Sequence, residues 1–168
     1  MTSVGIVGGS GYTGGDLLRL LHFHPDVAVT QITSRENAGH YVHSVHPNLR
    51  GVSSLQFIHP DALQPCDLLF LALPHGTTAS RIEQYTALAP TLIDLSADFR
   101  LNTTEEYSRW YGEAHPAPEW LGRFVYGLPE VSREQLRGAH YASGVGCNAT
   151  TVNLALLPLA RAGVIDRA

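Results

Sequence analysis

The sequence predicts an α/β fold with a doubly wound, mainly parallel sheet, and three observations support this. Short apolar runs alternate with helical stretches, which is typical of parallel strands joined by crossover helices. A glycine-rich turn stands between the first apolar run and the first helical stretch. Four unusual segments directly follow apolar runs, at the edge of such a sheet where ligands bind. These segments are residues 8–14, 74–76, 96–100 and 144–147, and we expect them to converge on one crevice.

Length and composition limit the classes of protein to consider. The chain has 168 residues, 44% hydrophobic and 15% charged, which is enough for one globular domain with its own core. The net charge of -4 and the pI near 6.1 argue against nucleic-acid binding. We expect no membrane span, since no run of about 18 apolar residues occurs, and no signal peptide. Two cysteines cannot form a disulfide framework, so a reducing cytoplasm is expected.

The elements follow from apolar runs and their breakers. Val4–Val7 predicts a buried strand, and Gly14–His24 predicts a helix that Pro25 closes. Residues 35–50 are polar and interrupted by glycine and proline, so they predict a loop, whereas residues 101–130 predict an ordered, aromatic-rich excursion. Further strands are expected over residues 27–33, 55–58, 67–73, 91–95 and 140–142, and helices over 77–88 and 148–162, the last kinked or ended by Pro158.

The turn after the first strand has the spacing G-x-x-G-x-x-G. Glycines allow the backbone to approach a ligand closely, and the free N–H groups and dipole of the following helix favour negative charge. Plain turns also contain such glycines, but the position between strand and helix favours a pyrophosphate site in a Rossmann-like domain. We assign to this site Gly8, Ser10, Gly11, Tyr12, Thr13 and Gly14.

The end of the second strand indicates which dinucleotide is bound. An NAD site usually has an acidic residue there, but this chain has Ser34 and Arg35. A guanidinium pairs well with a phosphate, so these residues favour NADP, although Glu36 leaves NAD open. Pro74 and His75 follow a later strand, where a backbone loop would pass the nicotinamide. We expect Pro74 to border the cofactor and His75 to shape the loop.

Cys147 is the candidate nucleophile. It follows two glycines after the last strand and starts a helix, whose N-terminus stabilises a thiolate and could hold an oxyanion. The alternative is a small buried cysteine, which is how we interpret Cys66.

Polar residues after the strand ending at residue 95 form a second candidate group. Arg100 could clamp a substrate phosphate or carboxylate, and Ser96 could contact cofactor or phosphate. The alternative for these residues and Asp98 is a capping and salt-bridge cluster. We assign Arg100 and Asn148 to substrate. We expect no metal site, because the stretch with His40, His43 and His46 is broken by glycine and proline and has no carboxylate.

Six ordered segments together resemble the N-acetyl-γ-glutamyl-phosphate reductase family. They are residues 7–14, 46–51, 72–76, 94–100, 126–130 and 146–147, and they cover the chain nearly end to end. The resemblance implies NADPH-dependent reduction of an acyl phosphate to a semialdehyde, in arginine or lysine biosynthesis. It implies that the Cys147 thiolate expels phosphate to form a thioester, which hydride from NADPH converts through a thiohemiacetal to the aldehyde.

Two features depart from the common pattern of that family. Cys147 is followed by Asn148 rather than by Tyr or Phe, which is similar to the branch that reduces carrier-protein-linked aminoadipyl or glutamyl phosphate. Family enzymes are also about twice as long, and their second half supplies most of the substrate domain, an acid/base histidine and dimer contacts. We therefore expect residues 1–147 to be an NADP-binding domain and residues 148–168 the first helix of a largely absent catalytic and dimerisation domain. The full-length form is expected to be a homo-oligomer, and the 168-residue chain alone to be inactive.

Two other functions remain open on the sequence. A non-catalytic NADP-binding module would bind NADPH without needing Cys147. Another semialdehyde dehydrogenase, such as an aspartate-semialdehyde dehydrogenase, would share the fold and the thiol chemistry, although residues 94–100 and 126–130 speak against it.

Overall fold

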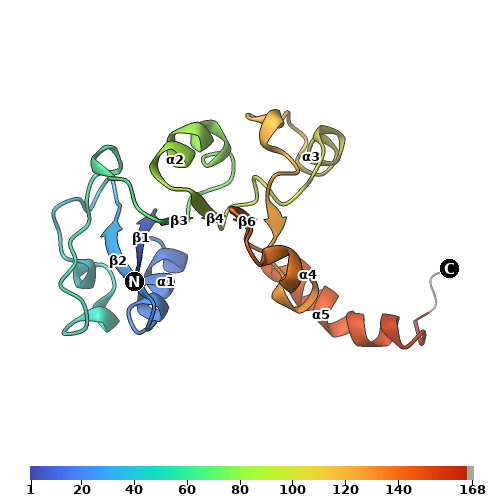
Figure 1. The fold of residues 1–168 in the computed structure, drawn as a ribbon, viewed down its shortest axis with the longest axis horizontal. Coiled ribbons are helices and arrows are strands. Elements are labelled where there is room, and N and C mark those ends of the chain that lie inside the picture. The colour runs from blue at the N-terminus through green and yellow to red at the C-terminus, as the bar shows by residue number, and fades with distance from the viewer. Residues whose placement is uncertain (166–168) are drawn as a thin grey trace.

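The computed structural model describes residues 1–165 and contains one six-stranded sheet in which every pair of neighbours is parallel (Figure 1). The strand order is β2-β1-β3-β4-β6-β5. Chain order therefore reverses at β1, which has β2 on one side and β3 on the other. The strands are β1 Thr2–Val7, β2 Val27–Ile32, β3 Leu68–Leu71, β4 Thr91–Asp94, β5 Val125–Tyr126 and β6 Tyr141–Ser143.

Helices cover both faces of this sheet, and α1 and α2 lie on opposite sides (Figure 1). On one face, Ile6 of β1 and Phe70 of β3 pack in a cluster with Leu18 of α1. On the other face, Leu71 of β3 packs in a second cluster with Tyr85 of α2. Alternate residues of one strand thus serve two cores, which confirms the predicted doubly wound architecture. The helices are α1 Tyr12–Leu21, α2 Ile82–Leu88, α3 Thr104–Tyr111, α4 Pro129–Leu136 and α5 Cys147–Arg161.

Several boundaries differ from the sequence predictions. Helix α1 begins two residues earlier than expected, because Gly11 already adopts the extended backbone of an N-cap. Residues 55–58 form isolated bridges instead of a strand, and the helix expected from residue 77 begins as a 3₁₀ turn at Ala79–Arg81. Helix α5 continues through Pro158 to Arg161 rather than ending there. The excursion over residues 101–130 contains α3, the short strand β5 and the start of α4.

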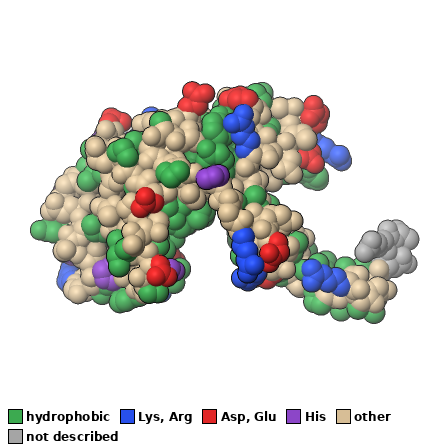
Figure 2. Space-filling model, in the orientation of Figure 1, with side chains coloured by type: hydrophobic (Ala, Val, Ile, Leu, Met, Phe, Trp, Pro, Cys, Tyr) green, Lys and Arg blue, Asp and Glu red, His purple; other side chains and the backbone are tan. Residues whose placement is uncertain are grey.

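Helix α5 extends away from the rest of the protein, and the space-filling view shows a hollow between this arm and the body (Figures 1 and 2). No described residue of the helix is buried, and Val152, Leu156 and Leu159 are each about half exposed. This arrangement matches a boundary near residue 147, which stays a proposal. Residues 166–168 of the second predicted unit lie outside the described residues.

The glycine turn supports a test with a matched control. A Cβ atom added at Gly14 would lie 2.6 Å from Cα of Gly9, a backbone atom that cannot easily move, whereas one added at Gly11 would lie 3.6 Å from its nearest neighbour. We therefore expect Gly14→Ala to lower the free energy of unfolding by about 1–3 kcal/mol. Gly11→Ala should change it by less than about 0.5 kcal/mol. Urea unfolding of both variants measures this, and equal effects would contradict the close approach of α1 to the turn.

Candidate functional site

Two cavities lie at the carboxyl ends of the strands. The first, here called the Cys147 cavity, has a volume of about 780 Å³ and follows β4 and β6. The second, here called the Arg35 cavity, has a volume of about 270 Å³ and lies beyond β1, β2 and β3, where the strand order reverses. Such a reversal is the usual place for ligands in an open α/β sheet. The glycine turn contributes to both cavities, through Thr13 to the first and through Gly8 and Ser10 to the second.

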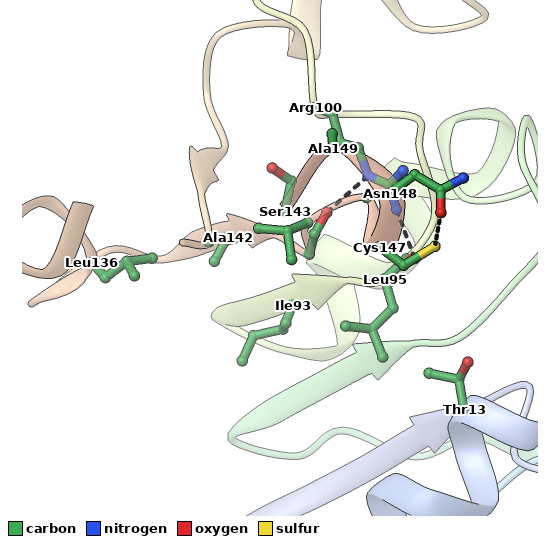
Figure 3. Close-up of a pocket in the computed structure, with 14 residues that line it drawn as sticks. Thr13, Ile93, Leu95, Arg100, Leu136, Ala142, Ser143, Cys147, Asn148 and Ala149 are labelled. Carbon is green, nitrogen blue, oxygen red and sulfur yellow. Dashed lines mark hydrogen bonds between the residues drawn. The ribbon is translucent and has the colours of Figure 1, made fainter. Parts of the chain in front are cut away.

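Cys147 is the first residue of α5 and is exposed at the wall of its cavity (Figure 3). The preceding residue, Gly146, has extended backbone and acts as the N-cap. The Sγ atom of Cys147 lies 3.9 Å from the side-chain amide oxygen of Asn148, which is a weak contact. The position therefore combines an accessible sulfur with the electropositive end of a helix of 15 residues, which are the conditions for a reactive thiolate.

Arg100 reaches the same cavity from the segment after β4. Its Nε donates a 2.8 Å hydrogen bond to the backbone oxygen of Gly144, which fixes the guanidinium against the loop before the thiol (Figure 3). A Cβ atom on Gly146 would lie only 3.2 Å from Nη1 of Arg100, so the glycine makes room for the guanidinium. Within residues 1–165 this guanidinium has no carboxylate within 4.0 Å, and it can pair with an anionic substrate group next to the sulfur.

Ser96 lines neither cavity. Its side chain is buried, and its hydroxyl donates a 2.7 Å hydrogen bond to Oδ2 of Asp94. The backbone N–H of Ser96 also donates to this carboxylate, and that of Asp98 donates to the Ser96 hydroxyl. The structure thus shows Ser96 in a local capping arrangement, so the predicted cofactor contact stays a prediction.

Asp94 gives the site a pH dependence that can be measured. Burial raises the pKa of this fully buried carboxyl to about 6, against the hydrogen bonds from Ser96. Between about pH 4 and pH 6 the folded protein keeps a proton that the unfolded chain releases, so the contribution of Asp94 to stability falls as the pH rises. We expect the stability of Asp94→Asn relative to the wild type to rise by up to about 3 kcal/mol from pH 4 to pH 7. Urea unfolding at both pH values tests this, and a constant difference would contradict it.

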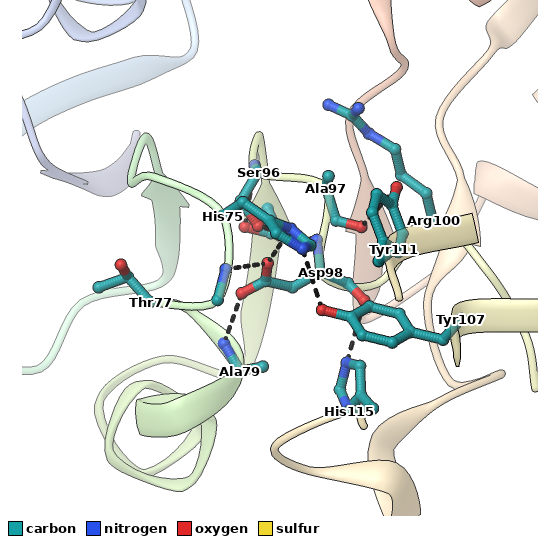
Figure 4. A network of polar contacts seen from close by, with 12 residues as sticks. His75, Thr77, Ala79, Ser96, Ala97, Asp98, Arg100, Tyr107, Tyr111 and His115 are labelled. Carbon is teal, nitrogen blue, oxygen red and sulfur yellow. Dashed lines mark hydrogen bonds and ion pairs between the residues drawn. The ribbon is translucent and has the colours of Figure 1, made fainter. Parts of the chain in front are cut away.

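Asp98 organises a polar network that holds the loop after β3 (Figure 4). Its fully buried carboxylate accepts hydrogen bonds from the backbone N–H groups of Gly76, at 2.6 Å, and Ala79, at 2.8 Å. Nδ1 of His75 lies 2.9 Å from the same carboxylate, and Nε2 lies 3.1 Å from the hydroxyl of Tyr107. Burial and nearby acidic groups raise the pKa of Tyr107 to about 12, so it stays a hydroxyl donor. His75 is therefore tied into this network, and the loop-shaping role expected for it stays a prediction.

The Arg35 cavity brings together the residues predicted to select the cofactor. Ser34 and Arg35 follow β2, and Pro74 follows β3. The Ser34 hydroxyl donates to Oγ of Ser10 at 3.0 Å, which joins the second strand to the glycine turn. The backbone N–H of Gly8 donates to the Thr33 hydroxyl at 3.2 Å. An exposed guanidinium beside these hydroxyls is suited to a phosphate group.

Most of the predicted site residues line two cavities that share the glycine turn, and the expected single crevice stays a prediction. Gly11, Tyr12 and Gly14 line neither cavity, and the Tyr12 side chain is 97% exposed. The first group, in the Cys147 cavity, is Thr13, Arg100, Cys147 and Asn148, and the second, in the Arg35 cavity, is Gly8, Ser10, Ser34, Arg35 and Pro74.

Sequence reasoning missed a supporting role for His46. Its Nε2 atom lies 2.8 Å from the carbonyl oxygen of Gly9, and its ring packs so closely on Gly15 that a Cβ there would collide with it. The signal was available, because His46 begins one of the six segments on which the family resemblance rests. No three His, Cys, Asp or Glu side chains in the described part of the chain are grouped to hold a metal ion. No helix within residues 1–165 is long and apolar enough to cross a membrane.

Comparisons with known proteins agree on the type of domain. Residues 3–139 match the family model described as semialdehyde dehydrogenase, NAD binding domain. Over 99% of its length the chain is 57% identical to a putative LysW-L-2-aminoadipate 6-phosphate reductase of Thermomicrobium roseum, covering 47% of that protein. It is also 50% identical to an N-acetyl-gamma-glutamyl-phosphate reductase of Azotobacter vinelandii, covering 100% of this chain and 50% of that one. The chain thus spans about half the length of these relatives.

A solved structure shares the fold. Aspartate semialdehyde dehydrogenase II of Vibrio cholerae, complexed with ASA, matches 95% of this chain and 46% of its own, with a TM-score of 0.64. The sequence identity is 13%, so this likeness supports the Rossmann-like architecture alone.

Proposed function

Because the chain belongs to the semialdehyde dehydrogenase family, through its NAD-binding domain, we propose that it is the cofactor-binding and thiol-bearing part of an acyl-phosphate reductase. The substrate would be an N-acylated glutamyl or aminoadipyl phosphate and the product its semialdehyde, in arginine or lysine biosynthesis. The single observation that carries this proposal is the Cys147 cavity, where an exposed sulfur at a helix N-terminus lies beside the guanidinium of Arg100. The 57% and 50% identities to phosphate reductases support the substrate class.

The nicotinamide cofactor of this domain fits the residues around the Arg35 cavity. The turn after β1 needs glycine at position 8, where φ is +82°, and at position 14, where α1 meets the turn. This close backbone approach, next to a helix N-terminus, suits a pyrophosphate. We assign the binding of NADP, rather than NAD, to Ser34 and Arg35, with Pro74 lining the same cavity. When bound, the cofactor supplies the hydride for the reduction.

The residues of this chain account for the covalent steps. The Cys147 thiolate attacks the carbonyl carbon of the acyl phosphate, the C–O bond to phosphate breaks, and the electron pair leaves with inorganic phosphate. The resulting thioester keeps the acyl group in place until it is reduced to the aldehyde level and the thiolate is released. Arg100 and Asn148 would orient the substrate phosphate or carboxylate, and backbone N–H groups at the start of α5 would stabilise the oxyanion.

The relatives favour a carrier-linked substrate. Two proteins that are 57% and 53% identical to the chain are described as LysW-aminoadipate phosphate reductases, compared with 50% for an N-acetyl-gamma-glutamyl-phosphate reductase. The sequence Val145-Gly146-Cys147-Asn148 supports the same choice. We therefore propose a carrier-protein-linked acyl phosphate as the substrate. We also propose a cytoplasmic homo-oligomer as the working form, with the cofactor-binding unit ending near Cys147.

An assay of the reverse reaction tests the proposed function. The natural full-length protein should reduce NADP when supplied with the semialdehyde and inorganic phosphate, followed by absorbance at 340 nm. Omitting phosphate should stop the reaction, because the thioester then lacks its acceptor. Binding of NADPH without phosphate-dependent turnover on any glutamyl or aminoadipyl semialdehyde, free or carrier-linked, would instead support a non-catalytic module.

A further inference from the structure

A second arginine borders the Arg35 cavity from a different part of the chain. Arg81 ends the 3₁₀ turn Ala79–Arg81 that leads into α2, whereas Arg35 follows β2. The two residues are 46 positions apart in the sequence, yet the fold brings both side chains to a cavity of about 270 Å³. Arg81 is half-buried and Arg35 is exposed.

Within residues 1–165, no carboxylate neutralises Arg35 or Arg81. The ion pairs of residues 1–165 involve Arg19, Arg137 and two histidines, and neither Arg35 nor Arg81 lies within 4.0 Å of an acidic oxygen. Two like charges in one small cavity repel each other, and this repulsion energy grows as water is excluded. An anion between them turns this repulsion into attraction, so the arrangement is typical of an anion site.

The walls of the cavity suit a phosphate attached to a ribose. Thr77 borders the cavity and its hydroxyl can donate a hydrogen bond, and the Ser34 hydroxyl can donate to a phosphate in exchange for its bond to Ser10. Tyr85 is 4% exposed, and burial raises the pKa of its phenol, while the guanidinium groups of Arg81 and Arg35 oppose this rise. Arg35, Arg81 and Tyr85 all line this cavity. The Pro74 side of the cavity offers an apolar surface to the nucleoside.

We propose that Arg81 is a second phosphate-binding guanidinium, which acts with Arg35 on the 2′-phosphate of the cofactor and so sets its preference for NADP over NAD. This inference rests on the proposed nicotinamide cofactor and names a residue that determines its specificity. Residue 81 lies in no glycine turn and after no strand end, so no sequence pattern indicated it.

The test compares two adenosine probes that differ only in the 2′-phosphate, adenosine 2′,5′-bisphosphate and adenosine 5′-monophosphate. Isothermal titration calorimetry on the natural full-length protein measures both dissociation constants. Arg81→Ala should weaken binding of the bisphosphate about ten- to hundredfold, the usual range for a hydrogen-bonded charge. Binding of the monophosphate should stay within about twofold, which also shows that the variant is folded. Arg81→Lys should weaken binding of the bisphosphate less than Arg81→Ala does, because the charge remains while the bidentate geometry is lost.

A matched control removes a positive charge elsewhere. Arg137 is the exposed residue directly after α4 and is paired with Glu134, so Arg137→Ala should leave both constants unchanged. If the wild type prefers the bisphosphate but Arg81→Ala binds it as tightly, the role of Arg81 is wrong while the proposed cofactor stands. If Arg81→Ala weakens the binding of both probes equally, the role of Arg81 is structural and the inference fails. If the wild type itself does not distinguish the probes, the assignment of NADP fails.

Discussion

Replacement of Cys147 by alanine is expected to lower phosphate-dependent NADPH formation by the full-length protein about a thousandfold or more. No other described side chain can form the acyl thioester at this position, because the thiol is exposed in the cavity while the second cysteine lies elsewhere. Cys66 lies just before the amino-terminal end of β3, whereas Cys147 follows the carboxyl end of β6, and burial raises the pKa of the Cys66 thiol. It is therefore unsuited to act as a nucleophile at neutral pH.

Cys66→Ala is accordingly the matched control, and it should keep turnover within about threefold of the wild type. Cys147→Ser should also lose activity, since an alcohol is a far weaker nucleophile than a thiolate at pH 7. Calorimetric binding of NADPH should be retained in both Cys147 variants, because no atom of this residue borders the Arg35 cavity. Retained turnover in Cys147→Ala would overturn the assignment of the nucleophile.

Replacement of Asp98 by alanine is expected to lower the free energy of unfolding by about 3–5 kcal/mol. The change would leave the N–H groups of Gly76 and Ala79 without their acceptor and His75 without its carboxylate, around a fully buried position. Because these bonds hold the loop after β3, the variant should also bind NADPH more weakly.

Glu113→Ala provides the control for Asp98. Its carboxylate also approaches His75, at 3.4 Å, but its side chain is 59% exposed. An exposed contact of this kind contributes less than about 1 kcal/mol. The free energy of unfolding of Asp98→Asn should lie between those of Asp98→Ala and Glu113→Ala. The amide keeps one acceptor oxygen, while its NH₂ group faces an N–H donor. Urea unfolding compares all three, and equal stabilities for Asp98→Ala and Glu113→Ala would refute the role of the network.

The first strand, the glycine turn and the first helix could be predicted because their signals are local. An apolar run, three glycines and an amphipathic stretch follow one another within 21 residues, and the structure has β1 and α1 there. The strand order could not be predicted in this way, since it depends on pairing between distant segments. Strand β5 has only two residues, too few to show an alternating pattern.

Site residues that directly follow a strand end could be predicted from the sequence. Whether a side chain points into a cavity or into the core could not. The position of Arg100 after β4 was enough to place it beside Cys147. Ser96 follows the same strand, but its hydroxyl turns inward because the buried carboxylate of Asp94 needs a donor. Arg81 belongs to a predicted helix, where an arginine usually faces solvent, and only the folded chain shows that it borders the same cavity as Arg35.

Trapping of the acyl group on the protein shows directly whether Cys147 is the nucleophile. The full-length protein is incubated without nucleotide with the carrier-linked acyl phosphate, or with its free N-acetyl counterpart, quenched in acid, digested and analysed by mass spectrometry. We expect an acyl adduct on the peptide that contains Cys147, with none on the Cys66 peptide and none in Cys147→Ala. Phosphate-dependent turnover by a protein that shows no adduct on Cys147 would contradict it.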